Sequence, residues 1–140
     1  MRYIKLFEAY SPNHFWSELD QTEWHHLMDT FKKTYFTPNE AEEIRQLAVE
    51  LAPDSTEINS KDGKKYPYSW DLVDYATFTD EYGYYSIHML VHNISYITIY
   101  KLEDERFGIV ESWGMNNEAF FECDRWDGLI ETIKHIFEHA

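Results

Sequence analysis

The sequence predicts an α+β fold: two N-terminal helices, a largely antiparallel sheet of four to six strands, and a C-terminal helix packed on the sheet. Three observations predict it. Apolar residues recur at helical spacing over residues 20–52, β-branched and aromatic residues with turn signals dominate residues 56–123, and helical spacing returns over residues 124–140. Because 44% of its 140 residues are hydrophobic, we expect residues 1–140 to form a single globular domain with a core.

The first helix is predicted to begin after Asp20. Asp20 and Glu23 have the spacing of a capping box. Apolar residues then fall at i, i+3, i+4, i+7 and i+11 and define one face: Trp24, Leu27, Met28, Phe31 and Tyr35. Upstream, Ser11-Pro12 directly follows the opening stretch MRYIKLFEAY and breaks its pattern. We therefore expect residues 1–11 to form a peripheral segment.

The second helix has a clearer start signal. Thr37 is a predicted N-cap, Pro38 suits the first helical position, and Glu40 stands three residues after the cap. An apolar stripe follows, formed by Ala41, Ile44, Leu47, Ala48 and Leu51, and Pro53 ends the helix.

Strands are predicted to follow from Thr56. Asp62-Gly63 is a typical hairpin turn. The segment YYSIHMLV alternates between two faces, and the segments ISYITIYKL and RFGIVESW flank an acidic turn at residues 103–105. A last strand is predicted over residues 119–123, so these segments together indicate an antiparallel meander.

The C-terminal helix is predicted to begin at Asp124 as N-cap, with Asp127 at the third position. His135 and His139, four residues apart, are expected to point away from its apolar face into solvent, where a histidine near a helix C-terminus is favourable. A zinc site would need further ligands. The expected apolar face consists of Trp126, Leu129, Ile130, Ile133, Ile136 and Phe137.

The other reactive side chains do not form a recognisable site. Cys123, the only cysteine, alternates with Phe121 along its strand, which indicates a small core residue and not a nucleophile. His88 and His92, if they belong to one strand, share a face but lie about 13 Å apart. We expect the remaining histidines to lie at the surface or at the rim of the core: His14, His25 and His26.

No motif in the sequence indicates an enzyme. The glycine-rich phosphate loops, the nucleophile elbow and the HExxH zinc motif are all missing. The acidic run over residues 71–81 lacks the alternating oxygen ligands and the glycine of a calcium loop. We therefore expect a non-catalytic protein without cofactor or metal.

The net charge limits the classes of molecule that the protein is expected to bind. The 26 acidic and 12 basic residues give a formal charge of −14, which disfavours direct binding to nucleic acid or to anionic membranes. No apolar run approaches the roughly 20 residues that cross a bilayer. The acidic residues form either a well-solvated surface or a mimic of a polyanion that binds the basic groove of another protein.

Tyrosine and tryptophan are unusually dense between residues 66 and 86. They either anchor a partner, as these side chains often do, or surround an aromatic core. With their acidic neighbours they form the predicted interface: Tyr66, Tyr68, Trp70, Asp71, Asp74, Asp80, Glu81, Tyr82 and Tyr84.

Four segments resemble small uncharacterised proteins of tailed, T4-like bacteriophages: MRYIKLFEAY, FTPNEAEEI, IYKLEDERFGIV and FFECDRWDGLIETI. They cover about a third of the chain in the same order. The resemblance implies a phage origin and action in the cytoplasm of the bacterial host. The first ten residues are also similar to N-terminal segments of T4-like head proteins, which implies an alternative location in the virion.

Together these observations predict a protein-interaction module of phage type that inhibits a host or defence protein, with acidic nucleic-acid mimicry as one mode. The alternative is a virion- or head-associated structural or co-injected protein, and a small enzyme is the third hypothesis. The host partner and the oligomeric state are left open by the sequence.

Overall fold

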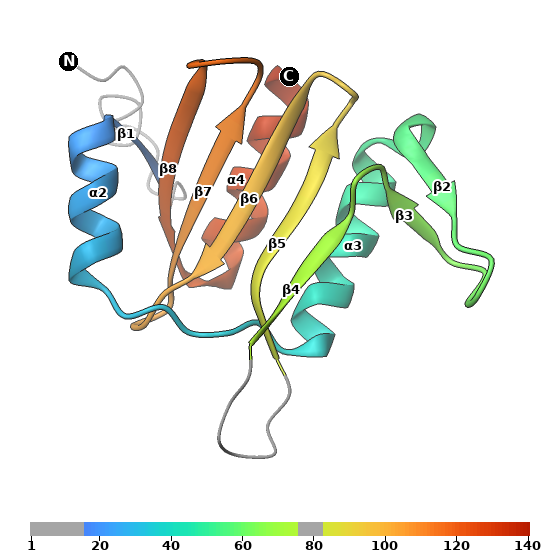
Figure 1. The fold of residues 1–140 in the computed structure, drawn as a ribbon, viewed down its shortest axis with the longest axis horizontal. Coiled ribbons are helices and arrows are strands. Elements are labelled where there is room, and N and C mark those ends of the chain that lie inside the picture. Colours follow the sequence, from blue (N-terminus) through green and yellow to red (C-terminus); the bar gives the residue numbers. More distant parts are fainter. Residues whose placement is uncertain (1–15, 76–82) are drawn as a thin grey trace.

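The computed structural model describes residues 16–75 and 83–140 and confirms the α+β fold. The predicted peripheral segment, residues 1–11, lies outside the described residues. Six antiparallel strands form the main sheet in the order β1-β8-β7-β6-β5-β4, and β2 and β3 form a separate two-stranded sheet (Figure 1). The strands are β1 (Trp16–Leu19), β2 (Thr56–Ile58), β3 (Lys65–Pro67), β4 (Asp71–Tyr75), β5 (Gly83–Val91), β6 (Ser95–Lys101), β7 (Arg106–Ser112) and β8 (Glu118–Asp124). The helices are α2 (Gln21–Thr30), α3 (Pro38–Leu51) and α4 (Arg125–His139), with a 3-10 turn at Pro53–Ser55.

Strands β5 to β8 form the predicted meander, and two unpredicted strands, β4 and β1, extend it at its edges. β1 has only four residues, too few for a periodic pattern, and pairs with β8 from Trp16 opposite Cys123 to Leu19 opposite Phe120. β4 has an irregular pattern because its residues Asp71, Val73 and Asp74 are exposed at the edge of the sheet.

Helix α2 begins where the sequence predicts but ends earlier. The Asp20 side chain accepts a hydrogen bond from the Glu23 N–H at 2.8 Å. The helix stops at Thr30, so the prediction that it continues through Phe31 and Tyr35 is wrong. The reason is tertiary: the Lys32 N–H donates to Glu103 Oε1, and the Glu103 N–H donates to the Lys32 carbonyl, both at 2.9 Å. These bonds align the chain with the end of the β6–β7 hairpin.

Helix α3 and the hairpin after it match their predictions. The Glu40 N–H donates to Thr37 Oγ1 at 3.2 Å, and the Thr37 N–H donates to Glu40 Oε1 at 2.8 Å, which completes a capping box before Pro38. Gly63 has φ +72° in the turn between β2 and β3, a conformation that glycine adopts without strain.

Helix α4 packs on the sheet and begins after Asp124, as predicted. Asp124 is the N-cap residue, as predicted, but its side chain makes no capping hydrogen bond. Arg125 instead has φ +61°, and its N–H donates to the Glu105 carbonyl at 2.7 Å. The strand-to-helix junction is therefore held by the β6–β7 turn.

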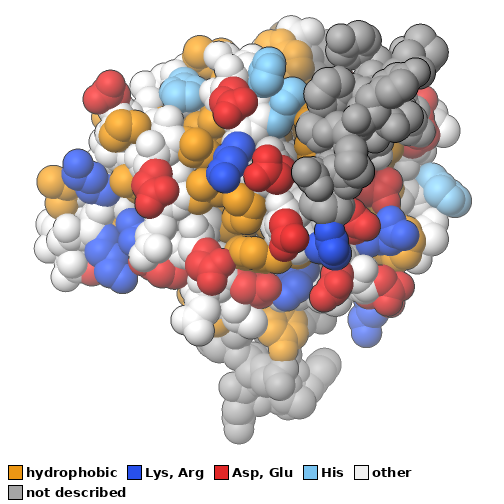
Figure 2. All heavy atoms as spheres, turned by 180° about the vertical axis from the view of Figure 1, so that it is seen from behind, with side chains coloured by type: hydrophobic (Ala, Val, Ile, Leu, Met, Phe, Trp, Pro, Cys, Tyr) orange, Lys and Arg blue, Asp and Glu red, His pale blue; other side chains and the backbone are white. Residues whose placement is uncertain are grey.

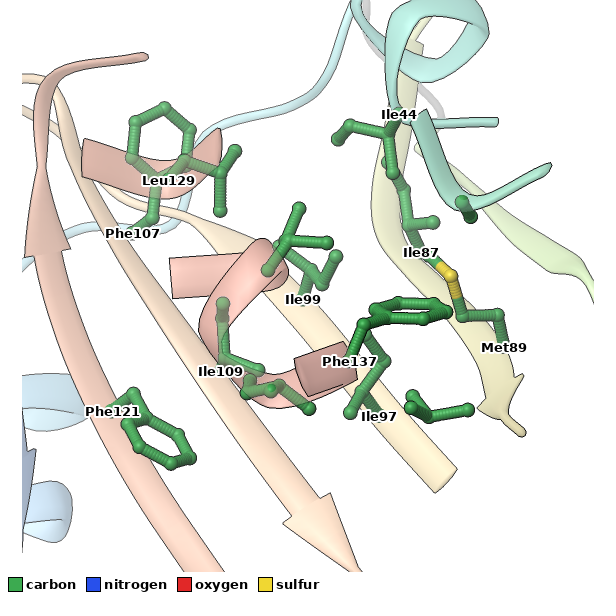
Figure 3. Packing of buried hydrophobic residues seen from close by; sticks show 14 of the residues in the cluster. Ile44, Ile87, Met89, Ile97, Ile99, Phe107, Ile109, Phe121, Leu129 and Phe137 are labelled. Atoms are coloured by element: carbon green, nitrogen blue, oxygen red, sulfur yellow. The ribbon is translucent and has the colours of Figure 1, made fainter. Parts of the chain in front are cut away.

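The main core lies between α3, α4 and one face of the sheet (Figure 3). Alternate residues of the central strands point to this face, and α4 contributes Phe137 beside Ile97 and Met89. The side chains on this face with the least exposure include Ile87, Met89, Ile97, Ile99, Ile109, Leu129 and Ile133. Burying such side chains stabilises the fold by about 1.5–3 kcal/mol each.

The second face of the sheet is covered only in part. Helix α2 packs on it through Trp24 and Leu27, which form a smaller cluster with Leu19 and Leu102. Trp24 also stacks on Phe120 of β8, with ring centroids 5.3 Å apart. This second core lies over β7, β8 and β1 and reaches Tyr100 near the end of β6, and it leaves β4, β5 and the rest of β6 on the same face without a covering helix in the described part of the chain.

Candidate functional site

Strand register aligns polar and aromatic side chains on the β4–β5–β6 half of the second sheet face, where the centroid of the Tyr100 ring lies 6.3 Å from that of the Trp24 ring of α2. One row crosses the strands from Asp71 through His88 to Thr98, and the neighbouring row pairs Ser86 with Tyr100. A third row pairs Leu90 with Tyr96. Six of these residues form what we call the His88 patch: Asp71, Ser86, His88, Tyr96, Thr98 and Tyr100.

His88 is the centre of a hydrogen-bonded network. Its Nε2 lies 2.8 Å from Ser86 Oγ, and its Nδ1 lies 3.1 Å from Thr98 Oγ1. Burial lowers the pKa of the His88 imidazole, and the Asp71 carboxylate opposes that shift. At neutral pH the ring is therefore uncharged, with a hydroxyl partner at each nitrogen.

Two tyrosines, Tyr96 and Tyr100, lie on the same face of the sheet as the imidazole. The Tyr96 ring lies 5.8 Å from the His88 ring at an interplanar angle of 31°. Burial raises the pKa of both Tyr96 and Tyr100, and Asp71 raises that of Tyr96 further, so both phenols keep their protons at neutral pH.

A change of register brings Tyr85 close to the patch. The pairing of β4 with β5 shifts between Val73 and Asp74: Val73 lies opposite Ser86 and Asp74 opposite Tyr84, with Tyr85 between the two pairs. The Tyr85 ring meets the Tyr100 ring edge to face at 6.2 Å, and Lys33 Nζ lies 5.8 Å from the Tyr85 centroid. The bulge thus extends the aromatic surface toward the start of β5.

The Ser86–His88 contact differs from a nucleophile and its general base. The partner of His88 Nδ1 is the Thr98 hydroxyl, where the serine triad has a carboxylate. Ser86 is only 3% exposed, so a substrate would not reach its hydroxyl without movement of the sheet. This geometry is suited to a surface with fixed ring positions and not to acyl transfer.

The predicted interface residues do not form one surface. Asp71 belongs to the His88 patch, whereas Tyr66 and Trp70 lie near the two-stranded sheet with ring centroids 6.4 Å apart. The Tyr66 ring also stacks on the Arg45 guanidinium, 5.1 Å from the centroid. Tyr84 packs against the main core, and its N–H donates to the Phe36 carbonyl at 2.9 Å.

The other predicted interface residues have different surroundings. Tyr68 is half-buried, and its carbonyl accepts from the Leu90 N–H at 2.9 Å. Asp74 is exposed on the edge strand β4. Three of the predicted residues lie outside the described part of the chain: Asp80, Glu81 and Tyr82.

Of the six residues in the His88 patch, the predicted interface contains only Asp71. The strand pattern does indicate which face of the sheet the residues of β5 occupy. The alternation of YYSIHMLV correctly separated Ile87 and Met89 from Ser86 and His88. Periodicity alone does not indicate where α2 packs, and the position of α2 decides how much of the second face is covered.

The C-terminal histidines have separate roles. His139 is exposed as expected, but the expectation that His135 points into solvent is wrong, because its ring stacks on Trp16 at a centroid distance of 4.3 Å. The unpredicted strand β1 supplies that tryptophan. His92 lies beyond the end of β5, and its Nε2 is 3.0 Å from the Phe137 carbonyl.

Cys123 is a core residue, as predicted. It is 1% exposed, and burial raises the pKa of its thiol to about 12. A thiol in this state is a poor nucleophile at neutral pH.

Residues 16–75 and 83–140 contain no group of three or more His, Cys, Asp or Glu side chains placed to hold a metal ion. Within the same ranges no helix is both long and apolar enough to span a membrane. His14 lies outside these ranges.

The acidic side chains do not form a continuous surface on the helix side of the molecule, where they alternate with lysine and arginine (Figure 2). Ion pairs hold several of them: Glu40 with Lys101 at 2.9 Å, and Glu122 with Arg106 at 2.6 Å. On this side of the molecule the acidic groups are therefore interspersed with basic ones.

A groove of about 440 Å³ lies beside α2, away from the His88 patch. Glu122 lines it, and the pairing of Glu122 with Arg106 compensates that charge. The other lining residues are Leu19, Thr22, Glu23, His26, Leu27 and Phe31.

Comparison of the chain with known protein families, with curated proteins and with solved structures finds no match in any of the three.

Proposed function

We propose that the protein is a non-catalytic protein-binding module of phage type and that it antagonises a host or defence protein through the His88 patch. The observation that carries this proposal is the partial coverage of the second sheet face: α2 covers β7, β8 and β1 and reaches Tyr100, while His88 and Tyr96 remain half-exposed on β5 and β6.

The chemistry of the patch supports a protein partner. Tyrosine and histidine combine apolar area with a polar group, and tyrosine loses little side-chain entropy on binding. The network of Ser86, His88 and Thr98 fixes the imidazole before any partner arrives, which reduces the cost of ordering the surface. The formal charge of −14 disfavours nucleic acid as the ligand.

An aromatic patch predicts a different response to salt from a polyanion mimic. A mimic holds its partner through many exposed charges, so its affinity falls steeply as salt is added. The His88 patch has one carboxylate, Asp71, among neutral groups, so its affinity should depend only weakly on salt.

The test is capture of host proteins from a nuclease-treated lysate by the tagged full chain. Wild type is compared with Tyr96→Ser, which removes a ring of the patch, and with Trp113→Ser, which removes an aromatic ring from the β7–β8 turn that is 44% exposed. We expect one stoichiometric host protein, captured by wild type and Trp113→Ser and lost with Tyr96→Ser.

Two results would contradict the proposal. Capture of only phage head proteins or copies of the chain itself would support the virion or structural alternative. Equal capture by all three proteins would move the interface away from the His88 patch, and a steep loss in salt would then indicate the mimic.

A further inference from the structure

Asp71 is an exposed residue of the His88 patch. In the described residues its carboxylate makes no side-chain hydrogen bond and no ion pair, in contrast to Glu40, Glu42 and Glu122. It stands directly opposite His88 in the β4–β5 register, and its charge acts on both His88 and Tyr96. The patch thus has an uncompensated negative charge beside two aromatic rings.

The two rings form a platform. The imidazole of His88 and the phenol of Tyr96 lie on the same side of the sheet, with ring centroids 5.8 Å apart and ring planes inclined by 31°. Ser86 and Thr98 satisfy both imidazole nitrogens from within the sheet, which leaves the ring face for an external group.

The chain itself places cations on comparable rings. Lys33 Nζ lies over Tyr85, the Arg45 guanidinium over Tyr66, and the Arg106 guanidinium over Phe31 at 4.6 Å. Arg45 and Arg106 each pair with a glutamate at the same time, through Glu42 and Glu122. A guanidinium held between an aromatic face and a carboxylate is therefore an arrangement that recurs in this protein.

We propose that the His88 patch binds an arginine side chain of the partner protein, with the guanidinium stacked on Tyr96 and His88 and hydrogen-bonded to the Asp71 carboxylate. This inference rests on the proposed function and specifies the chemistry that the partner must present. Arginine fits better than lysine because its planar group stacks on rings and can donate two parallel hydrogen bonds to a carboxylate.

The ionisable groups that face the site favour a cation over an anion. They are Asp71 from β4, His88 from β5, and Tyr96 and Tyr100 from β6, and at neutral pH the imidazole and both phenols are uncharged. Lys33 lies over Tyr85 and its charge acts on Tyr100, whereas no basic side chain of the described residues is among the groups that shift the pKa of His88 or Tyr96.

The test is an NMR titration of the full chain with a blocked glycine–arginine–glycine tripeptide. The ring signals of His88 and Tyr96 report the site, and the matching glycine–citrulline–glycine tripeptide, which has the same shape without the charge, is the control ligand. We expect saturable shifts of both rings with arginine and none with citrulline.

Two isosteric variants test whether the Asp71 carboxylate is the charge that binds arginine. Asp71→Asn removes the proposed carboxylate from an exposed position and should weaken arginine binding about tenfold, the scale of one charge-assisted hydrogen bond. Asp104→Asn makes the same change in net charge in the β6–β7 turn and should leave binding unchanged. Equal affinity in both variants, or shifts that do not saturate, would overturn the inference.

The result is separable from the capture of host proteins. A partner that wild type and Asp71→Asn capture equally well would uphold the proposed function and overturn the arginine site. Saturable arginine binding without any captured host protein would uphold the site and overturn the proposed function.

Discussion

Gly108 of β7 lies directly beneath the indole of Trp24 of α2: a β-carbon at position 108 would lie 2.8 Å from Trp24 Cη2 and 2.9 Å from Cζ3. Real β-carbons do not approach other atoms so closely. Gly108→Ala should therefore lower the free energy of unfolding by about 1–3 kcal/mol, the usual cost of overpacking. Urea denaturation followed by tryptophan fluorescence and by circular dichroism measures the change.

A double-mutant cycle tests the cause. In a Trp24→Leu background the indole is gone, and the further change Gly108→Ala should cost less than about 0.5 kcal/mol. An undiminished cost would mean that the β-carbon at 108 meets some group other than Trp24.

Local sequence patterns predicted the fold well where an element is specified by its own residues. Thr37, Pro38 and Glu40 define the start of α3 without help from the rest of the chain. The end of α2 and the edge strands β1 and β4 depend on tertiary contacts: Lys32 leaves the helical path to pair with Glu103, 71 residues away in the chain. Such long-range bonds have no local signal.

The pKa of His88 predicts how stability depends on pH. Because the folded pKa is below the unfolded value of about 6.5, the unfolded chain binds more protons between these two values. The free energy of unfolding should therefore decrease as the pH falls below about 6.5. His88→Gln, which cannot titrate, should reduce this dependence in denaturation experiments between about pH 7 and pH 5.

The effect of Asp71 on His88 can be measured directly. The Asp71 charge raises the His88 pKa against the larger effect of burial, so Asp71→Asn should lower that pKa further. An NMR titration of the imidazole signals gives both values. A higher pKa in Asp71→Asn would show that the carboxylate does not act on the ring as the structure indicates.

Glu111 is partly buried, and burial disfavours the charged form of its carboxyl. Burial raises the pKa of its carboxyl, Glu18 adds to the shift, and the hydrogen bond from Ser95 Oγ at 2.8 Å opposes it. The folded state therefore binds more protons than the unfolded state above the unfolded pKa of about 4.3, and stability falls as the pH rises through the folded pKa. Glu111→Gln keeps an acceptor for Ser95 and should raise the melting temperature at pH 7.

The gain from Glu111→Gln should shrink at about pH 4, where the carboxyl of the wild type is protonated in the folded state. Glu57→Gln, an exposed change of the same kind in β2, should alter the free energy of unfolding by less than about 0.5 kcal/mol. A gain from Glu111→Gln that is independent of pH would exclude the proposed electrostatic cause.

The candidate site was less predictable than the fold. The density of tyrosines indicated a region, but Tyr66 and Tyr84 are partly used in packing against Arg45 and the main core. Tyr96 and Tyr100 stand on a strand that looked like any half-buried strand. Whether a polar face binds a partner or is covered depends on how far α2 extends over it, and the length of α2 was itself set by Lys32 and Glu103.

The burial of Cys123 predicts a thiol that reacts only through unfolding. Its pKa of about 12 leaves almost no thiolate at pH 8, and its 1% exposure prevents contact with a reagent. Labelling by a thiol-specific reagent should therefore be slow in the native protein and should accelerate in urea in parallel with the loss of circular dichroism. Met115→Cys adds a second thiol at a position that is 92% exposed. This thiol should be labelled rapidly in the native protein and serves as the internal control for Cys123. Rapid labelling of both thiols without denaturant would show that strand β8 opens away from α4 on its own, because Cys123 is enclosed between them.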